Sequence, residues 1–564
     1  MLIRKKNLSR RTILKGMGMA LGAPFFDAAI VEENSWAMPQ APATPAQIAY
    51  STKGMVVSSS PVAAAVGAHV LERGGNAIDA AVATAFTLSV VEFGLFGLGG
   101  RMQMLLRSPS GDIAGMDGTI QVPGGYVKSP TDDGIGYTTI GAPGAVAALG
   151  KAHRMFGSIA FPDLLAPAIE LASNGFVLTE HQARTIHSEA VHLKKFDGSR
   201  RQFFKPDGSE YEPGERLMLP DLAHTLTILA KDGTDAFYHG EIAQQISEDM
   251  KAHGGSLRAS DLAAYEARSA RVVRGSYRGY DLVGTDAPAA GSTVIEVLQI
   301  MEYFDLPSKS PAEWAAIVAQ AMRLGFKDQY HDFGGPEEAA RMKSSKQLAA
   351  ERAKQIQEPG RPLNANRQVF SGWPDAGDTT HFSIADSKGG LVSSTQTLGS
   401  GMGAKVVSPG LGFLYAATMG FPGAFASTPG QRATTSMSPF LVLKDGKPAY
   451  ALGAAGGMRI ISSIVEVISR SIDQKLPFPD AVAAPRVHPD PGSYIEPAGE
   501  EFALESGGKN SWSMQDLARI KSYGFKLVEQ KPSSFAVIHA VQITNGEYVG
   551  VADPRNGGAA MGVK

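Results

Sequence analysis

The apolar pattern of the chain changes at Thr379, and this change limits the folds that are open to it. From Thr379 onward, apolar residues alternate with polar ones, which is the period of a β-strand. Glycine-containing turns separate the alternating segments, and this arrangement predicts three antiparallel hairpins. Their strands and turns are residues 381–385 and 391–397 around 388–390, residues 440–443 and 449–453 around 444–446, and residues 535–541 and 548–551 around 545–546.

The part of the chain before Thr379 is mainly helical in pattern. Apolar residues recur with the helical period over residues 61–91, and Gly74-Gly75-Asn76 divides this stretch into two helices. The polar residues 190–215 are expected to wrap the surface. Because both halves combine strands with helices, the sequence predicts an α+β protein whose sheets are covered by helical layers. Further helices are predicted after 141–144 and at 159–172, 222–229, 242–253, 292–304, 313–326 and 459–472, and strands at 55–59, 102–106 and 272–283.

A segment of low apolar content precedes Thr379. Residues 340–370 are first charged and then contain proline and asparagine, which predicts a mobile linker. The linker leads to Asp378, and such a segment suits a site that must be strained or must come free after cutting.

Composition excludes several classes of function. The formal net charge of -2 argues against nucleic acid or an anionic membrane surface as a general partner. The absence of cysteine excludes disulfides, thiolate metal sites and cysteine nucleophiles. His488 and Asp490 are too few for a metal site, and the turn Gly97-Leu98-Gly99-Gly100 lacks the further features of a dinucleotide site. We therefore expect no metal and no cofactor.

The N-terminus resembles a twin-arginine export signal. The run SRRTILK at 9–15 precedes a weakly apolar stretch, and Ser35-Trp36-Ala37 offers a cleavage site before Met38. The apolar stretch is too short to cross a bilayer, and no later segment is long and apolar enough for a membrane span. Residues 1–37 are thus expected to be a signal peptide of a periplasmic or secreted protein; the alternative is a basic, disordered tail.

Thr379 and a set of downstream residues suit an amide hydrolase with an N-terminal threonine. Once the bond before it is cut, a threonine supplies both a hydroxyl nucleophile and an α-amine, whose pKa of about 7.7–8.0 allows it to act as a base near neutrality. Adjacent glycines such as Gly456-Gly457, between a strand and a helix, let backbone N–H groups approach an oxyanion. His381 is expected to be a packed histidine rather than a base.

An ordered set of short segments resembles the γ-glutamyltransferase family of N-terminal-nucleophile hydrolases. The resemblance covers the chain from about Met55 to its end. Its segments are 74–81, 97–100, 141–144, 235–238 and 277–280 in the first half, and 379–383, 436–439, 456–457, 485–488 and 553–555 in the second.

The resemblance implies a fold and a site. The fold is a four-layer αββα sandwich formed jointly by a large fragment, 38–378, and a small fragment, 379–564, which would form a heterodimer. Thr379 would be the nucleophile and the self-cleavage residue, and the hydroxyl of Thr397 would steady it. The remaining implied roles are substrate contact for Thr435 and Ser436 and oxyanion stabilisation for Gly456 and Gly457.

The sequence departs from the family at the residues that recognise glutamate. Thr119 stands where the family has the arginine that pairs with the α-carboxylate, and Phe421 stands where it has the aspartate that holds the α-ammonium. Neither can form the ion pair. Arg101 interrupts a glycine run, either as a surface or structural residue or as a relocated cation beside the site. The short loop between Phe421 and Arg432 predicts an open cleft.

Three functions remain open from the sequence. One is a γ-glutamyl hydrolase or transferase acting on glutathione-like substrates. Another is a hydrolase of a different small-molecule amide, either a small amide such as oxamate or a larger acyl amide of the cephalosporin-acylase kind. The third is a non-catalytic paralogue that keeps the fold.

Overall fold

The structure is a computed structural model that describes residues 46–128, 133–329, 331–356, 378–420, 426–489, 501–508 and 510–564. Residues 38–564 form one compact unit. The predicted signal peptide, residues 1–37, lies outside the described residues, and so does Phe421. None of the helices in the described part of the chain is long and apolar enough to cross a membrane.

Two antiparallel sheets form the centre of the unit, and one long strand joins them. The strand β7 (Arg268–Tyr277) pairs through its first residues with the second sheet and through the rest with the first. In spatial order, the first sheet contains β1 (Ile48–Ser51), β17 (Glu547–Ala552), β16 (Val537–Thr544), β12 (Lys447–Ala455), β11 (Phe440–Lys444) and β8 (Tyr280–Asp286). The second contains β4 (Ile113–Gly118), β3 (Arg101–Arg107), β10 (Leu391–Thr397), β9 (Thr379–Asp386), β2 (Gly54–Ser58) and β18 (Ala559–Gly562).

The two sheets pack face to face over a continuous apolar core. Burial of this apolar surface favours the sandwich, because each sheet alone would leave one face in water. Strands β9 and β10 lie against β12, and β2 lies against β17. The core between the sheets is built from Met55, Val57, Leu105, Val283, Ala385, Leu391, Leu441, Leu443, Ala451, Val541, Tyr548, Ala552 and Ala560.

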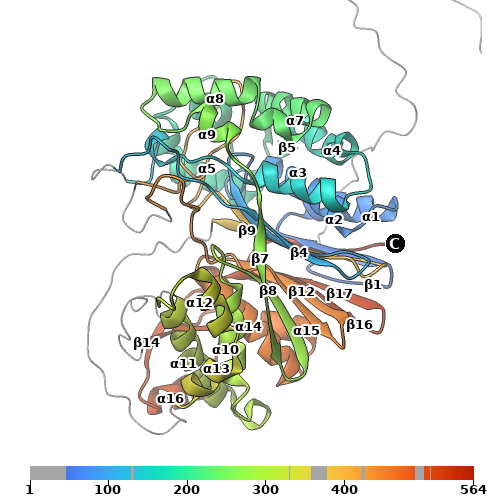
Figure 1. Ribbon diagram of the computed structural model, residues 1–564, viewed down its shortest axis with the longest axis vertical. Helices are drawn as coiled ribbons and strands as arrows, with labels where there is room; N and C mark the ends of the chain where they lie inside the picture. The colour runs from blue at the N-terminus through green and yellow to red at the C-terminus, as the bar shows by residue number, and fades with distance from the viewer. Residues whose placement is uncertain are drawn as a thin grey trace, which may run out of the picture. The chain divides into compact units, whose positions relative to one another are not determined.

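Helices cover the outer face of each sheet, which completes four layers (Figure 1). On the second sheet, α1 (Pro61–Glu72) lies against β2, α2 (Ala77–Val91) against β9 and β10, and α3 (Ala145–Phe156) against β4. On the first sheet, α10 (Gly291–Met301) lies against β7 and β8, and α14 (Arg459–Ile472) against β12. The predicted αββα architecture is therefore confirmed.

The remaining elements lie outside the two large sheets. They are the helices α4 (Phe161–Asn174), α5 (Glu180–Leu193), α6 (Asp197–Phe203), α7 (Pro220–Asp232), α8 (Glu241–Ala252), α9 (Ala259–Ala263), α11 (Pro311–Gln329), α12 (Pro336–Lys343), α13 (Lys346–Ala353), α15 (Phe478–Ala483) and α16 (Met514–Ser522), and the strands β5 (Phe176–Val177), β6 (Arg216–Leu217), β13 (Val487–Pro489), β14 (Glu501–Glu505) and β15 (Lys526–Gln530).

Strands from the two sides of Thr379 alternate in both sheets. In the second sheet β10 and β9 lie between β3 and β2, and in the first sheet β17, β16, β12 and β11 lie between β1 and β8. A cut before Thr379 would therefore leave two chains that share both sheets and the core between them. This strand order agrees with the prediction that the two fragments would form the sandwich together.

The division of residues 61–91 into two helices is confirmed and has a local cause. The side chain of Asn76 accepts hydrogen bonds from the backbone N–H groups of Ile78 and Asp79. In return, Asp79 accepts a bond from the N–H group of Asn76 at 2.9 Å. This capping box starts α2 and satisfies N–H groups that would otherwise be unpaired.

One predicted strand is in fact a hairpin. Residues 272–283 contain the end of β7 and the start of β8, which pair with each other. The turn is formed by Arg278 and Gly279, whose φ angles are 50° and 76°. Two consecutive residues in the left-handed region match the right-handed twist of the paired strands. The single-strand prediction was wrong because arginine rarely adopts this conformation, so the turn had no sequence signal.

The segment predicted to wrap the surface and the segment predicted to be a mobile linker both contain helices. Residues 190–215 include α6, in which Phe203 is fully buried. The predicted linker 340–370 begins with α12 and α13, and Arg352 of α13 forms an ion pair with the buried Asp328 of α11. The segment has a low apolar content because it contains charged residues. Some of these form ion pairs with buried carboxylates, as Arg352 does with Asp328, and are therefore part of the folded structure. Residues 357–377 of the linker lie outside the described residues.

Candidate active site

Three of the sequence-predicted residues lie on one rung of the second sheet. Thr379 begins β9, Thr397 ends β10 and Arg101 begins β3, and Thr397 is paired with both of the others. Directly opposed residues of antiparallel strands place their side chains on the same face. Two residues further along β9, His381 lies against Gly453 of β12, so this face is turned toward the first sheet. The three side chains are therefore gathered at one end of the space between the sheets.

The hydroxyl of Thr397 contacts the peptide bond that self-cleavage would break. Its Oγ1 donates a hydrogen bond of 2.5 Å to the carbonyl oxygen of Asp378 and accepts one of 2.8 Å from the N–H group of Gly399. The residue is buried, with 2% of its surface exposed. A donor in this position polarises the carbonyl and would stabilise negative charge that develops on its oxygen.

The first sheet contributes the glycine pair from the end of β12. Gly456 and Gly457 have φ angles of 142° and 58°, which residues with a Cβ rarely adopt. A Cβ at Gly456 would lie 2.6 Å from the Cα of Ala536, so a side chain is also excluded by space. The glycines lead into α14, whose N-terminus carries a partial positive charge. The pair can thus present backbone groups to an anion.

Thr435 and Ser436 lie next to the glycine pair. The hydroxyl of Ser436 donates a hydrogen bond of 2.8 Å to the carbonyl of Gly457, which ties the two segments together. Thr435 is held by a bond of 2.9 Å from its own N–H group to the carbonyl of Pro288. The structure therefore brings the segment of Thr435 and Ser436 to Gly456 and Gly457, and their roles in substrate contact and oxyanion stabilisation stay predictions.

Arg101 is a buried cation within this site. Only 3% of its surface is exposed, so Arg101 is not a surface residue, and a structural arginine or a relocated cation remain as interpretations. Its Nη1 donates a hydrogen bond of 3.2 Å to the carbonyl of Thr434, which places the guanidinium beside Thr435. Burial lowers the pKa of Arg101 to about 10, which leaves the side chain charged at neutral pH.

Thr119 lies deeper and is engaged with other protein groups. Its hydroxyl donates a hydrogen bond of 2.6 Å to Oδ1 of Asp117. Its carbonyl accepts bonds from the hydroxyl of Tyr265 at 2.7 Å and from Arg432 at 3.1 Å. Thr119 is fully buried, so its contact with a substrate stays a prediction. The position of Phe421 lies outside the described residues.

His381 is the packed histidine that the sequence predicted. Its Nδ1 is 2.8 Å from the hydroxyl of Thr395, and its Nε2 is 3.1 Å from the hydroxyl of Ser383. Burial, together with the nearby His539, holds the pKa of His381 well below its usual value. The ring is neutral and fully hydrogen-bonded at both nitrogens, so it is not available as a base for Thr379.

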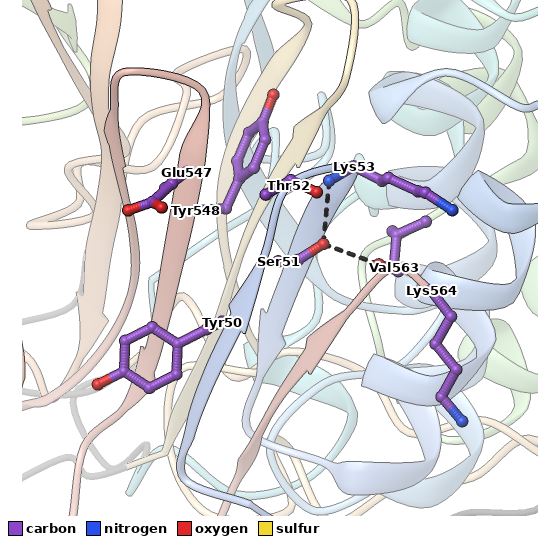
Figure 2. Close-up of a pocket in the computed structure, with 8 residues that line it drawn as sticks. All are labelled: Tyr50, Ser51, Thr52, Lys53, Glu547, Tyr548, Val563 and Lys564. Carbon is purple, nitrogen blue, oxygen red and sulfur yellow. Dashed lines mark hydrogen bonds between the residues drawn. The ribbon is translucent and has the colours of Figure 1, made fainter.

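A surface hollow is found far from this site (Figure 2). It is lined by residues of β1, of the turn between β1 and β2, of β17 and of the C-terminus, among them Lys53, Glu547 and Tyr548. The hydroxyl of Tyr548 donates to the carbonyl of Asp386, at the opposite end of β9 from Thr379. At about 3.3 Å per residue, the length of β9 separates the two places by about 23 Å. The hollow is not part of the candidate active site. Among the described residues, no group of three or more potential ligands could hold a metal ion.

The sequence missed the residues around Asp378. The carboxyl of Asp378 lies against Gly401. Burial raises the pKa of this carboxyl, while the charge of Lys405 lowers it and that of Glu189 raises it. These residues come from a loop after β10 and from α5, and neither has a sequence motif. Only the fold brings them to the bond before Thr379.

Comparison with known proteins agrees with this geometry. A family model described as Gamma-glutamyltranspeptidase matches residues 63–563. The chain belongs to the γ-glutamyltranspeptidase family. It is accordingly an enzyme of this family, whose members are amide hydrolases and acyltransferases.

Similar members of the γ-glutamyltranspeptidase family differ in their named activities. A glutathione hydrolase proenzyme of Pseudomonas sp. (strain A14) is 31% identical over 554 residues, which cover 90% of this chain and 94% of the relative. An acylase ACY 1 proenzyme of Pseudomonas sp. (strain SE83) is 34% identical over 473 residues, which cover 79% and 84%. The crystal structure of a cephalosporin acylase from Bacillus halodurans has the same fold, with a TM-score of 0.80 at 24% identity and coverage of 95% and 100%.

Proposed function

We propose that this chain is the precursor of an amide hydrolase or acyltransferase in which Thr379 becomes the N-terminal nucleophile. The observation that carries the proposal is the rung in which Thr397 faces Thr379 and donates to the carbonyl of Asp378. This hydroxyl contacts the one peptide bond whose cleavage would create the new N-terminus. The names of two similar relatives as proenzymes support a precursor that is processed.

Self-cleavage would start from the hydroxyl of Thr379. Its oxygen attacks the carbonyl carbon of Asp378, the bond from that carbon to the nitrogen of Thr379 breaks, and the nitrogen receives the hydroxyl proton. The acyl group is then held on Thr379 as an ester, which water hydrolyses to a carboxylate on Asp378 and a free hydroxyl on Thr379. The bond from Thr397 stabilises the negative charge on the carbonyl oxygen during the attack.

Turnover would use the same oxygen on an external amide. The freed α-amine accepts the proton of the hydroxyl as Thr379 attacks, and returns it to the leaving amine. We propose that Gly456 and Gly457 stabilise the oxyanion from the end of β12, and that Thr435 and Ser436 contact the acyl group. Water or an amine then takes the acyl group from the enzyme.

We further propose that the acyl group carries a carboxylate but no ammonium group. The buried guanidinium of Arg101 lies beside Thr435, where it could pair with a carboxylate in place of the arginine that Thr119 replaces. Phe421 cannot hold an ammonium group, so both changes favour monoamides of dicarboxylic acids over γ-glutamyl amides. The similarity to a protein named as an acylase supports this choice.

A pair of anilide substrates tests the proposed function. Glutaryl-p-nitroanilide and γ-glutamyl-p-nitroanilide differ only in the α-ammonium group. The ratio of their kcat/KM values on the processed protein therefore measures how well the enzyme accepts that group. We expect the glutaryl compound to be preferred by about tenfold or more, because a charge-assisted hydrogen bond contributes about 1.5–3 kcal/mol and the ammonium group would lose its solvation unpaired. A preference for the γ-glutamyl compound would contradict the proposed specificity and favour a glutathione-type hydrolase.

The substitution Arg101→Met isolates the contribution of the guanidinium. We expect kcat/KM for the glutaryl anilide to fall by about ten- to a hundredfold, the equivalent of one charge-assisted contact, and that for butyryl-p-nitroanilide to change much less. Arg107→Met is the matched control, since Arg107 ends the same strand β3 and its Nη1 donates to the carbonyl of Gly389. An equal loss on both substrates would show that Arg101 supports the fold rather than the acyl group.

We also propose export by the twin-arginine route, supported by the run at 9–15. The precursor would then cross the membrane folded. Fractionation of cells that express the full chain checks this, with Arg10→Lys/Arg11→Lys as the comparison. Equal amounts in the periplasm from both forms would contradict it.

A further inference from the structure

Two charged residues, the buried Lys405 and the half-buried Glu189, lie beside the residue before the proposed cleavage bond. Lys405, with 4% of its surface exposed, places its Nζ 3.4 Å from Oε2 of Glu189 on α5 and in a hydrogen bond with the carbonyl of Gly401. On the same helix, Oε2 of Glu189 also lies 3.1 Å from Nδ1 of His192. Gly401, whose carbonyl Lys405 binds, lies in turn against the carboxyl of Asp378.

The loop that carries Lys405 is held in a costly conformation. Met402 and Lys405 have φ angles of 55° and 65°, in the left-handed region that non-glycine residues rarely occupy. Contacts at both ends keep the loop in place: the N–H group of Met402 donates to the carbonyl of Gly94 at 2.8 Å, and the carbonyl of Lys405 accepts a bond of 2.6 Å from the hydroxyl of Ser199. These contacts fix the backbone conformation of the loop and therefore the position of the groups that it presents to Asp378.

The geometry that the loop maintains is a cradle for the side chain of Asp378. A Cβ at Gly401 would lie 3.3 Å from Oδ1 of Asp378, so the backbone of the loop approaches the carboxyl closely. Burial raises the pKa of Asp378, while the backbone of Gly401 and the charge of Lys405 oppose that rise. The carboxyl is therefore held by the loop on one side of the residue while Thr397 holds its carbonyl on the other.

We propose that Lys405, supported by Glu189, is a positioning residue for self-cleavage that fixes Asp378 in the precursor and favours its departure afterwards. The inference rests on the proposed function. Before the cut, the cradle and the bond from Thr397 together fix the carbonyl carbon for attack by Thr379, and such orientation accounts for a large part of the rate of an intramolecular reaction.

The same cluster becomes unfavourable once the bond is cut. Hydrolysis of the ester adds an α-carboxylate to Asp378, so this residue then carries two carboxylates in the neighbourhood of Glu189, and Lys405 is the cation that acts on them. Like charges in a buried place repel each other strongly. The new C-terminus is thereby driven out of the cradle, and the oxygen of Thr379 becomes accessible to an external amide.

A double-mutant cycle on the full chain tests the inference. The rate of self-cleavage is measured by pulse-chase for the unchanged chain, Asp378→Asn, Lys405→Met and the double variant. We expect each single change to slow self-cleavage by about tenfold, and the double variant to be about as slow as the slower single one, because both changes remove the same interaction. Multiplied single effects in the double variant would overturn the proposed coupling.

Further variants separate positioning from folding. Lys405→Arg keeps the charge and is expected to recover part of the rate, whereas Glu189→Gln should slow cleavage without preventing it. Uncut forms of the precursor, made with Thr379→Ala, should melt at similar temperatures with and without Asp378→Asn. After processing, Asp378→Asn is expected to leave kcat/KM within about twofold of the unchanged enzyme, since Asp378 has left the site. Normal cleavage rates in both single variants would remove this inference and leave the role of Thr379 intact.

Discussion

Thr379→Ala is expected to yield a folded, uncut precursor without amidase activity. Alanine lacks the hydroxyl that attacks the carbonyl of Asp378, so neither the cut nor the later acyl transfer can occur. The unchanged chain should instead give two bands, which scaling of 59.4 kDa by length places at roughly 36 kDa for 38–378 and 20 kDa for 379–564. A denaturing gel and N-terminal sequencing of the smaller band provide the measurement.

The neighbouring threonine is the matched control for this substitution. Thr380 follows Thr379 on β9, and its hydroxyl lies 2.5 Å from that of Ser59, so it is engaged elsewhere. Thr380→Ala should therefore still be cut. A smaller fragment that begins at any residue other than Thr379 would place the nucleophile elsewhere, and an unchanged chain that is never cut would favour a non-catalytic member of the family.

Thr397→Ala is expected to slow self-cleavage by about a hundred- to a thousandfold. The substitution removes the hydrogen bond of 2.5 Å to the carbonyl of Asp378, and loss of one oxyanion donor typically costs about 2.7–4 kcal/mol in the barrier. The time course of fragment formation, followed on a gel after a pulse of synthesis, measures the effect.

A conservative change at the same position provides the control. Thr397→Ser keeps the hydroxyl and removes only a methyl group, so we expect it to be cut within about tenfold of the unchanged rate. If Thr397→Ala were cut as fast as Thr397→Ser, the hydroxyl would have no part in the reaction. Its hydrogen bond to the carbonyl of Asp378 would then contribute only to the structure of the precursor.

Local chemistry explains why the hairpins could be predicted. Asn545 and Gly546 have φ angles of 53° and 82°, and Asp445 and Gly446 have φ angles of 52° and 72°. These residue types tolerate the left-handed region, so the turns can be predicted from two adjacent residues of the sequence. The alternating segments on either side then pair in the predicted order, as β11 with β12 and β16 with β17.

Several residues of the predicted site lie at corresponding ends of strands, while their roles stay predictions. Thr379, Thr397, Gly456 and Ser436 lie at the ends of β9, β10 and β12 and in the segment before β11, where the two sheets face each other. Their residue types suggested the chemistry, and their order resembled a family. The burial of Arg101 could not be predicted, because it depends on the segment around Thr434, more than 300 positions further along the chain.

The sequence by itself determined which residues could carry an amide-cleaving reaction and which short segments would be strands, helices and turns, because both depend on residue type and on neighbours along the chain. Only the tertiary structure decided that Arg101 lies on the same rung as Thr379, that charged residues of the predicted linker form parts of α12 and α13, and that Lys405 and Glu189 meet beside Asp378. These features arise from pairing between strands and helices that are distant in sequence, and the free energy of burying charged groups depends on partners that such pairing supplies.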